Sequence, residues 1–171
     1  GNDYTHISLS GGKYKIPDDK LDEYYSLLEK SKTYYLVERH LDDKSSLIID
    51  IDLKNNENVR YITDDVIETI IKTINKVLKS LFFECNKKVF VLQRDRVYMK
   101  DDYYKDGLHI IYPEVIGKYN ILTLLRNILL EELKLLEEYS KLSVKGIDDI
   151  IDERVIKTNG LVMYGGDKPE I

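Results

Sequence analysis

Ser46-Leu47-Ile48-Ile49-Asp50-Ile51-Asp52-Leu53 is the stretch that decides the fold, because it reads as a β-strand with two chemically opposite faces. Side chains alternate across a strand, so one face is wholly aliphatic and the other presents Asp50 and Asp52, about 7 Å apart. Aspartate is depleted in strands, and two adjacent like charges repel each other unless a positive charge lies between them. A divalent cation bound by hard oxygen ligands meets that need. The strand therefore predicts a metal site; a solvated strand end with two exposed carboxylates is the alternative.

Size and charge are those of an ordinary globular domain. The 171 residues suffice for one domain, or for one domain with a small appendage, and for a sizeable core. The net charge of -5 supplies no general basic field for nucleic acid. This argues against a protein whose only task is to coat DNA, but not against an enzyme whose acidic centre is neutralised by metal.

Cysteine content and hydropathy restrict the environment of the chain. The single cysteine, Cys85, excludes a disulfide framework and a cysteine-based zinc site, and we expect a buried, reduced thiol in a cytosol-like compartment. No apolar run approaches the roughly 18 residues of a membrane span, so no membrane partner is expected. The chain begins at Gly1 without methionine and both ends look cut, which predicts one domain excised from a longer polypeptide.

Residues 1–45 are predicted to form a small N-terminal αβ module. A helix is expected over Leu21–Lys30 and a short β-prone run over Thr33–Val37. His6 is interpreted as an ordinary loop residue.

Residues 46–171 are predicted to form the larger, catalytic unit. Thr63 is a good N-cap for a helix whose aliphatic stripe continues to Leu81. The later elements are strands at Lys88–Gln93 and Gly107–Tyr112, a helix over about Lys118–Tyr139 and a short strand near Leu161–Tyr164. This order is βαββαβ, the arrangement of ferredoxin-like and RNA-recognition-motif-like domains, and the predicted fold class is α+β.

In that topology the first and third strands are central neighbours, and the helices leave one face of the sheet open. Gly107 and His109 are then expected beside Asp50 and Asp52 on the open face. A third carboxylate is predicted at Asp152, which follows an aliphatic pair, and three carboxylates fit a two-metal site for phosphoryl transfer. For His109, a purely structural, hydrogen-bonded role is an equal alternative.

Two basic features complete the set of candidate residues. Lys168 follows a Gly-Gly pair and is suited to act as a point charge on a triphosphate, although a solvated turn lysine is the more ordinary interpretation. Basic and aromatic residues interleave between the second and third strands, as in a track for single-stranded nucleic acid; the basic members are Arg94, Arg96, Lys100 and Lys105. The alternative is a solvated β-connection with surface tyrosines.

Three motifs occur in a characteristic order and spacing. They are the aspartate-bearing strand, Lys105-Asp106-Gly107-Leu108-His109-Ile110, and Ile151-Asp152-Glu153-Arg154-Val155 running into Tyr164-Gly165-Gly166-Asp167-Lys168-Pro169. Together they resemble the archaeo-eukaryotic primase superfamily. The resemblance is strongest to the primase domain at the N-terminus of the helicase–primase of large nucleocytoplasmic DNA viruses, and it spans essentially the whole chain.

The resemblance implies a role for each motif. Asp50, Asp52 and Asp152 correspond to the acids that hold two Mg²⁺ or Mn²⁺ ions. The positions that correspond to contacts with the incoming NTP or dNTP are Lys105, Gly107, His109 and Lys168. Also implied are a single-stranded DNA template, a helicase domain that follows in the same polypeptide, and action at a viral replication site in the host cytoplasm.

We therefore predict a nucleotidyltransferase, a primase or primase–polymerase, that makes primers on single-stranded DNA. One alternative is a metal nuclease or replication initiator, which calls for more histidines or a tyrosine nucleophile beside the metal. The other is a catalytically weak or inactive primase-fold module for template binding or helicase assembly. Gly107, where the family often has serine, and Val162, near the position of a frequent arginine, favour this last alternative.

Overall fold

The computed structural model describes residues 3–31, 34–39, 43–81, 83, 88–136, 139, 142–157, 160–162 and 166. The chain divides into a larger unit, Lys44–Ile156, and a smaller unit that comprises Gly1–Asp43 and Lys157–Ile171. Cys85 and Lys168 lie outside the described residues. The modules 1–45 and 46–171 stay a prediction.

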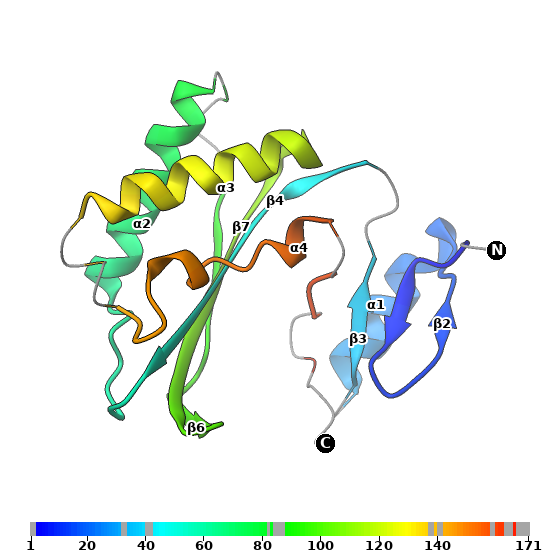
Figure 1. The fold of residues 1–171 in the computed structure, drawn as a ribbon. Helices are drawn as coiled ribbons and strands as arrows, with labels where there is room; N and C mark the ends of the chain where they lie inside the picture. Colours follow the sequence, from blue (N-terminus) through cyan, green and yellow to red (C-terminus); the bar gives the residue numbers. More distant parts are fainter. Residues whose placement is uncertain are drawn as a thin grey trace. The chain divides into compact units, whose positions relative to one another are not determined.

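An antiparallel sheet of four strands forms one layer of the larger unit (Figure 1). The strands are β4 (Lys44–Asn55), β5 (Phe90–Gln93), β6 (Tyr98–Lys100) and β7 (Tyr103–Lys118). β7 pairs with each of the other three, and its register with β4 places His109 opposite Asp50 and Gly107 opposite Asp52. The first and third strands of the predicted order are therefore neighbours, as expected.

The alternation predicted for β4 is confirmed by burial. The four aliphatic side chains on its inward face are only 0–1% exposed, and they are Leu47, Ile49, Ile51 and Leu53. On β7, Leu108, Ile110 and Tyr112 are buried in the same core. A shift of one residue in register would turn the whole set toward solvent. Such a shift is strongly disfavoured, because burying each of these side chains stabilises the fold by about 1.5–3 kcal/mol.

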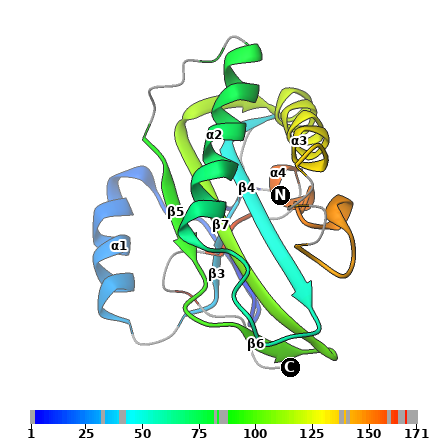
Figure 2. The same cartoon turned by 90° about the vertical axis from the view of Figure 1, so that its left-hand side faces the viewer.

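Two helices cover the apolar face of this sheet (Figure 2). They are α2 (Asp64–Ser80) and α3 (Tyr119–Lys134). The predicted cap of α2 is present, because the backbone N–H of Val66 donates to Thr63 Oγ1 at 3.4 Å. α3 ends before the predicted Tyr139, whose buried side chain instead donates its hydroxyl to the carbonyl of Val66 on α2 at 3.2 Å.

The edge of β4 is covered by a short segment rather than by the predicted last strand. Ile151 forms an isolated antiparallel bridge with Ile51. The N–H of Asp52 donates to the carbonyl of Ile150 at 2.9 Å, and that of Asp152 donates to the carbonyl of Asp50 at 3.0 Å. This segment lies between the 3-10 helix η2 (Ile147–Asp149) and the single-turn helix α4 (Arg154–Lys157).

The strand predicted near Leu161–Tyr164 lies partly outside the described residues, since Met163 and Tyr164 are not among them. Val162 forms an isolated bridge with Val37, and both residues belong to the smaller unit, so the described part of the predicted strand does not pair with β4. The physical reason is that Ile150 and Ile151 are 3% and 1% exposed. They complete the core while their backbone satisfies the polar groups of the β4 edge. The fold is mixed α+β.

The smaller unit contains a three-stranded sheet in the order β2-β1-β3. Its elements are β1 (His6–Ser8), β2 (Lys13–Tyr14), η1 (Asp18–Lys20), α1 (Leu21–Lys30) and β3 (Leu36–Glu38). The helix predicted over Leu21–Lys30 is confirmed. The interpretation of His6 as a loop residue is wrong, since it belongs to β1, is 2% exposed and packs edge-on against Tyr24 with ring centroids 4.9 Å apart.

Across the described part of the chain, no helix combines the length and the apolar character that a membrane crossing requires.

Candidate active site on the open face of the sheet

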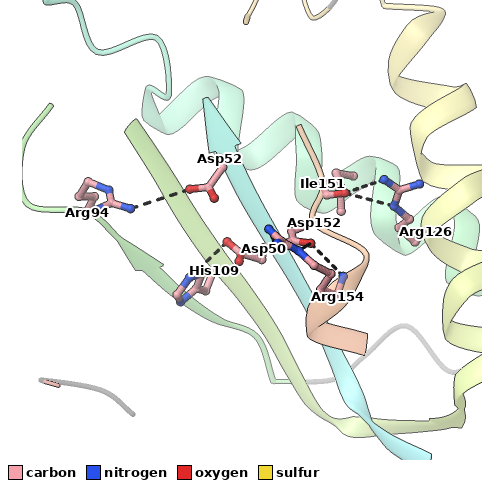
Figure 3. A network of polar contacts seen from close by, with 8 residues as sticks. All are labelled: Asp50, Asp52, Arg94, His109, Arg126, Ile151, Asp152 and Arg154. Atoms are coloured by element: carbon pink, nitrogen blue, oxygen red, sulfur yellow. Dashed lines mark hydrogen bonds and ion pairs between the residues drawn. The ribbon is translucent and has the colours of Figure 1, made fainter. Parts of the chain in front are cut away.

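Asp50 and Asp52 project from β4 on the face opposite the helices, and Asp152 joins them from the neighbouring edge segment (Figure 3). The side chains of Asp50 and Asp152 are only 15% and 20% exposed, whereas that of Asp52 is 55% exposed. The hydrogen bond from the backbone N–H of Asp152 to the carbonyl of Asp50 fixes the relative position of these two residues. Three carboxylates, from segments about a hundred residues apart in the sequence, thus lie along one edge of the sheet.

His109 lies directly across the strand pair from Asp50. Its Nε2 is 3.3 Å from Asp50 Oδ1, and its side chain is one-third exposed. Among the residues that the structure describes, the other ring nitrogen has no hydrogen-bond partner, so the imidazole is able to bind a second group while Asp50 orients it. The structure therefore brings His109 to the acids, as the alternation in β7 predicts.

Arg94, which follows β5, is brought to Asp52. Its Nη2 lies 3.8 Å from Asp52 Oδ1, and its guanidinium stands 4.9 Å from the centre of the Tyr98 ring. The backbone N–H of Arg94 donates to the carbonyl of Gly107 at 3.1 Å, which anchors the residue beside β7. An ion pair this long and this exposed is weak, so Arg94 contributes little to the position of the Asp52 side chain.

Asp152 is held by Arg154 in a planar fork. Arg154 Nε and Nη2 donate to Asp152 Oδ1 and Oδ2 at 3.0 and 2.9 Å, and the backbone N–H of Arg154 also donates to Oδ1 at 2.9 Å. These bonds hold the pKa of the Asp152 carboxyl below its usual value. The pKa of Arg154 is raised, first by Asp152 and to a lesser degree by Asp50 and Asp52, so this guanidinium lies in the field of all three acids.

Each acid is thus turned toward its own cationic or imidazole partner rather than toward the other acids (Figure 3). Among the residues that the structure describes, no group of three or more His, Cys, Asp or Glu side chains is arranged to hold a metal ion. The donor chemistry fits Mg²⁺ or Mn²⁺, which prefer carboxylate oxygens. Asp52 and Asp152 would have to rotate away from their arginines to share an ion with Asp50.

Gly107 is required by close packing of β7 on β4. A Cβ atom at this position would lie 2.6 Å from the carbonyl oxygen of Ile51 and 3.2 Å from Asp52 Oδ1. A serine here would therefore displace the backbone that carries the acids. The departure from the family pattern has a steric reason in this chain.

The remaining basic candidates are spread out. Lys105 lies opposite Lys54 on β4 and pairs with Asp101 at 3.3 Å. Arg96 is exposed in the loop between β5 and β6, and Lys100 is exposed at the end of β6. Arg94 is the member of this basic set that makes a direct contact with the acid row, by which we mean Asp50, Asp52 and Asp152.

A hollow of about 420 Å³ opens beside Asp52 and Asp152, between β4 and the segment 143–154. Its basic lining residues were not predicted from the sequence, and they are Lys54, Arg126, Lys145 and Arg154. Lys54 continues the polar alternation of β4 and was predictable by the same logic as the aspartates. Arg126 was not, because it reaches the site by donating to the carbonyl of Ile151 from α3, at 2.6 Å.

Comparison with known proteins gives two matches. Residues 5–171 match the sequence model of the family described as the C962R protein N-terminal AEP domain. The chain is also 28% identical over 176 residues to "Putative helicase L207/L206" of Acanthamoeba polyphaga mimivirus. That alignment covers 98% of this chain but only 18% of the length of the mimivirus protein. The predicted resemblance is confirmed, and the chain belongs to the archaeo-eukaryotic primase (AEP) superfamily, in the family of N-terminal AEP domains typified by the C962R protein.

Proposed function

We propose that this domain synthesises primers on single-stranded DNA by metal-dependent nucleotidyl transfer. The observation that carries the proposal is the convergence of Asp50, Asp52 and Asp152 on one open face, with His109 opposite Asp50. Family membership supports a primase-type activity.

The reaction joins two nucleotides. The 3′-oxygen of one forms a bond to the α-phosphorus of the incoming triphosphate, and the bond from that phosphorus to the bridging oxygen breaks. Pyrophosphate leaves with the electron pair, and the proton of the 3′-hydroxyl passes to solvent. Asp50, Asp52 and Asp152 would hold two Mg²⁺ or Mn²⁺ ions, which neutralise charge on the attacking and leaving oxygens when bound.

The other predicted residues have separate tasks in this proposal. His109, oriented by Asp50, would donate to a phosphate oxygen of the incoming nucleotide, and Lys105 and the close backbone at Gly107 would lie along the same triphosphate. Lys168 remains part of the proposal as a further charge on that group. Arg94, Arg96 and Lys100 would contact the template backbone.

The direct test compares single carboxylate variants with a matched control. Asp50→Asn and Asp52→Asn keep the side-chain shape but remove the charge, and each should lower primer synthesis at least about a hundredfold. Asp65→Asn, an exposed acid on α2, should leave it unchanged. The assay uses single-stranded DNA with Mg²⁺ or Mn²⁺ and offers NTPs and dNTPs separately. Undiminished synthesis by either site variant would contradict the proposal.

A non-catalytic role in template binding or helicase assembly is the second candidate. It is favoured by the two arginines that already occupy Asp52 and Asp152. Calorimetric titration with Mn²⁺, alone and with a nucleotide, separates the two, because an inactive module would bind neither. Since the mimivirus relative is named as a putative helicase, we also propose that the domain works with a helicase region of the same polypeptide.

A further inference from the structure

Asp106 is a carboxylate inside the hydrophobic core, and the proposed chemistry does not use it. On β7 it shares the inward face with Leu108 and Ile110, and it is only 1% exposed. Burial of a carboxylate costs free energy, and well-packed apolar residues are often as stabilising as a buried ion pair of the same volume. Stability alone therefore does not account for a charge at this position, and a local exception of this kind is typical of a functional site.

The Asp106 carboxylate contacts its own strand and the connection between β4 and α2. Its Oδ1 accepts from the backbone N–H of Gly107 at 2.9 Å, and its Oδ2 lies 3.5 Å from Arg60 Nε. Arg60 belongs to the connection, which is anchored in the core by Ile62, a residue 1% exposed. The carbonyl of Ile62 also accepts from Gln93 Nε2 of β5 at 2.7 Å. The buried charge thus joins β7 to a connection that is itself fixed.

Arg60 carries this fixed position to Arg94, just after β5. Arg60 Nη2 donates to the carbonyl of Arg94 at 2.7 Å, and the backbone N–H of Arg94 donates to the carbonyl of Gly107 at 3.1 Å. Together with the two contacts of Asp106, these bonds close a ring through Gly107, Asp106, Arg60 and Arg94. Both polar groups of the Arg94 backbone are bonded within the ring, so its backbone position depends on the buried pair.

The side chain of Arg94 leaves this ring and points toward Asp52 on the open face (Figure 3). The contact with Asp52, at 3.8 Å, is too weak to hold the guanidinium in place. The ring of Tyr98, 4.9 Å away, adds a cation–π contact of modest strength at an exposed site. The place of the Arg94 charge beside the acid row is therefore set largely by its backbone.

We propose that Asp106 and Arg60 are positioning residues, which hold the backbone of Arg94 so that its guanidinium meets a phosphate of the template strand. The inference rests on the proposed function, in which Arg94 contacts the template backbone. Asp106 is buried and cannot touch DNA, so it acts only through Arg60 and Arg94. A buried negative charge thus favours the binding of a negatively charged polymer.

The sign of one effect separates positioning from simple electrostatics. Removal of a negative charge by itself tightens DNA binding or, when the charge is remote, leaves it unchanged. Asp106→Asn should instead weaken the binding of a fluorescent single-stranded oligonucleotide at least about threefold, because Arg60 loses its partner and releases Arg94. Asp65→Asn removes the same charge from the exposed side of α2 and should have no effect. Fluorescence anisotropy with Mg²⁺ present, over a range of salt concentrations, measures both.

A double-mutant cycle tests whether Arg60 acts through Arg94. Arg94→Gln should weaken oligonucleotide binding about tenfold, and should reduce the slope of log affinity against log salt by about 0.7, the value for one phosphate contact on a single strand. Arg60→Gln alone should weaken binding at least about threefold, but in the Arg94→Gln background it should change affinity by less than about twofold. If Arg60 itself contacted a phosphate, the double variant would lose about 1.4 in slope.

Two measurements exclude a general loss of stability as the cause. Tyr112→Phe removes the hydroxyl that donates to Asn75 Oδ1 at 3.0 Å in the same core, so it should unfold more easily but bind the oligonucleotide like the parent chain. Hydrogen exchange followed by NMR should show faster exchange of the Arg94 and Gly107 amides in Arg60→Gln, and no such change in Tyr112→Phe.

The contrary outcomes are distinct. A folded Asp106→Asn variant that binds DNA as tightly as the parent chain would overturn the inference, and if this variant does not fold, the cycle with Arg60→Gln decides alone. Equal losses from Arg60→Gln with and without Arg94 would show that Arg60 does not act through Arg94. If the unmodified chain bound no single-stranded DNA, the proposed function would fail instead, and unchanged amide exchange in Arg60→Gln would show that the pair does not hold Arg94.

Discussion

Arg154 and Asp152 form the strongest charged contact of the acid row, and the contact is local in sequence. The fork of hydrogen bonds uses both carboxylate oxygens, which are the atoms that a metal ion would need. A bidentate pair is stronger than a single contact, but Arg154 is 73% exposed and so the pair is screened by solvent. Arg154 is therefore a displaceable counter-ion of Asp152.

Removal of this counter-ion should favour metal binding. Arg154→Gln should tighten Mn²⁺ binding about two- to fivefold, because an exposed ion pair is worth at most about 1 kcal/mol. The pKa of Asp152 should rise toward its usual value in the same variant, since the hydrogen bonds that lower this pKa are lost. Calorimetry with Mn²⁺ alone measures the first effect, and Arg154→Lys serves as the control that keeps the charge. Weaker Mn²⁺ binding by Arg154→Gln would show that Arg154 supports the site instead.

Gly107 provides a second test at the level of one residue. Gly107→Ala and Gly107→Ser should both lower the free energy of unfolding by about 1–3 kcal/mol, because either Cβ would overlap the Ile51 carbonyl. Urea denaturation measures the loss. Gly117→Ala is the comparison, since its nearest atom is the flexible end of Leu122 and the loss should be smaller. A stable Gly107→Ser variant with improved nucleotide binding would mean that only a hydroxyl is missing here.

The elements of the larger unit owe their positions to two patterns, alternation in the strands and capping in the helix. The alternation in β4 and β7 sends aliphatic side chains toward α2 and α3 and polar ones to the open face. The sequence analysis did not predict β6 or the hairpin that it forms with β7. The turn of this hairpin is the pair Asp101 and Asp102, which both have positive φ, 52° and 64°. Asp tolerates that conformation, and a two-residue turn of this kind matches the twist of a hairpin.

The N-cap of α2 gives a prediction for a whole element. Thr63→Ala should lower the free energy of unfolding by about 0.5–1 kcal/mol, because the N–H of Val66 loses its side-chain acceptor. Thr63→Ser keeps the acceptor and should unfold like the parent chain. Chemical denaturation followed by circular dichroism measures both. Equal stability of the alanine variant would mean that water replaces the cap without cost.

At the level of the whole molecule, the two units differ in how they respond to acid. His6 is buried in β1 of the smaller unit, and burial lowers its pKa from 6.5 despite the opposing charge of Glu38. The unfolded chain therefore binds a proton more readily than the folded unit does. The stability that neutral His6 confers is complete above about pH 6.5 and declines as the pH falls below that value toward the lowered pKa.

Hydrogen exchange detects this difference between units. Peptides from β1 and β3 should exchange faster at pH 5.5 than at pH 7.5, after correction for intrinsic rates, whereas peptides from β4 should not change. In His6→Phe, which keeps an aromatic ring beside Tyr24, the acid-dependent part should disappear. Exchange that rises equally in both units would assign the acid effect to other groups.

The sequence by itself determined the features that depend on neighbouring residues. The faces of β4, the cap of α2 and the choice of Asp50 and Asp52 follow from side-chain alternation and local hydrogen bonding, which act over a few residues. The prediction that His109 lies beside these aspartates needed only one further assumption, namely that β4 and β7 are neighbouring strands.

Only the tertiary structure decided which segment covers the edge of β4, which cation faces each acid, and that Lys54 and Lys145 share a hollow. Ser143 and Lys54 are 89 residues apart in the chain and meet through two hydrogen bonds. Contacts of this kind depend on how well distant surfaces fit each other, and no local pattern in the sequence encodes that fit.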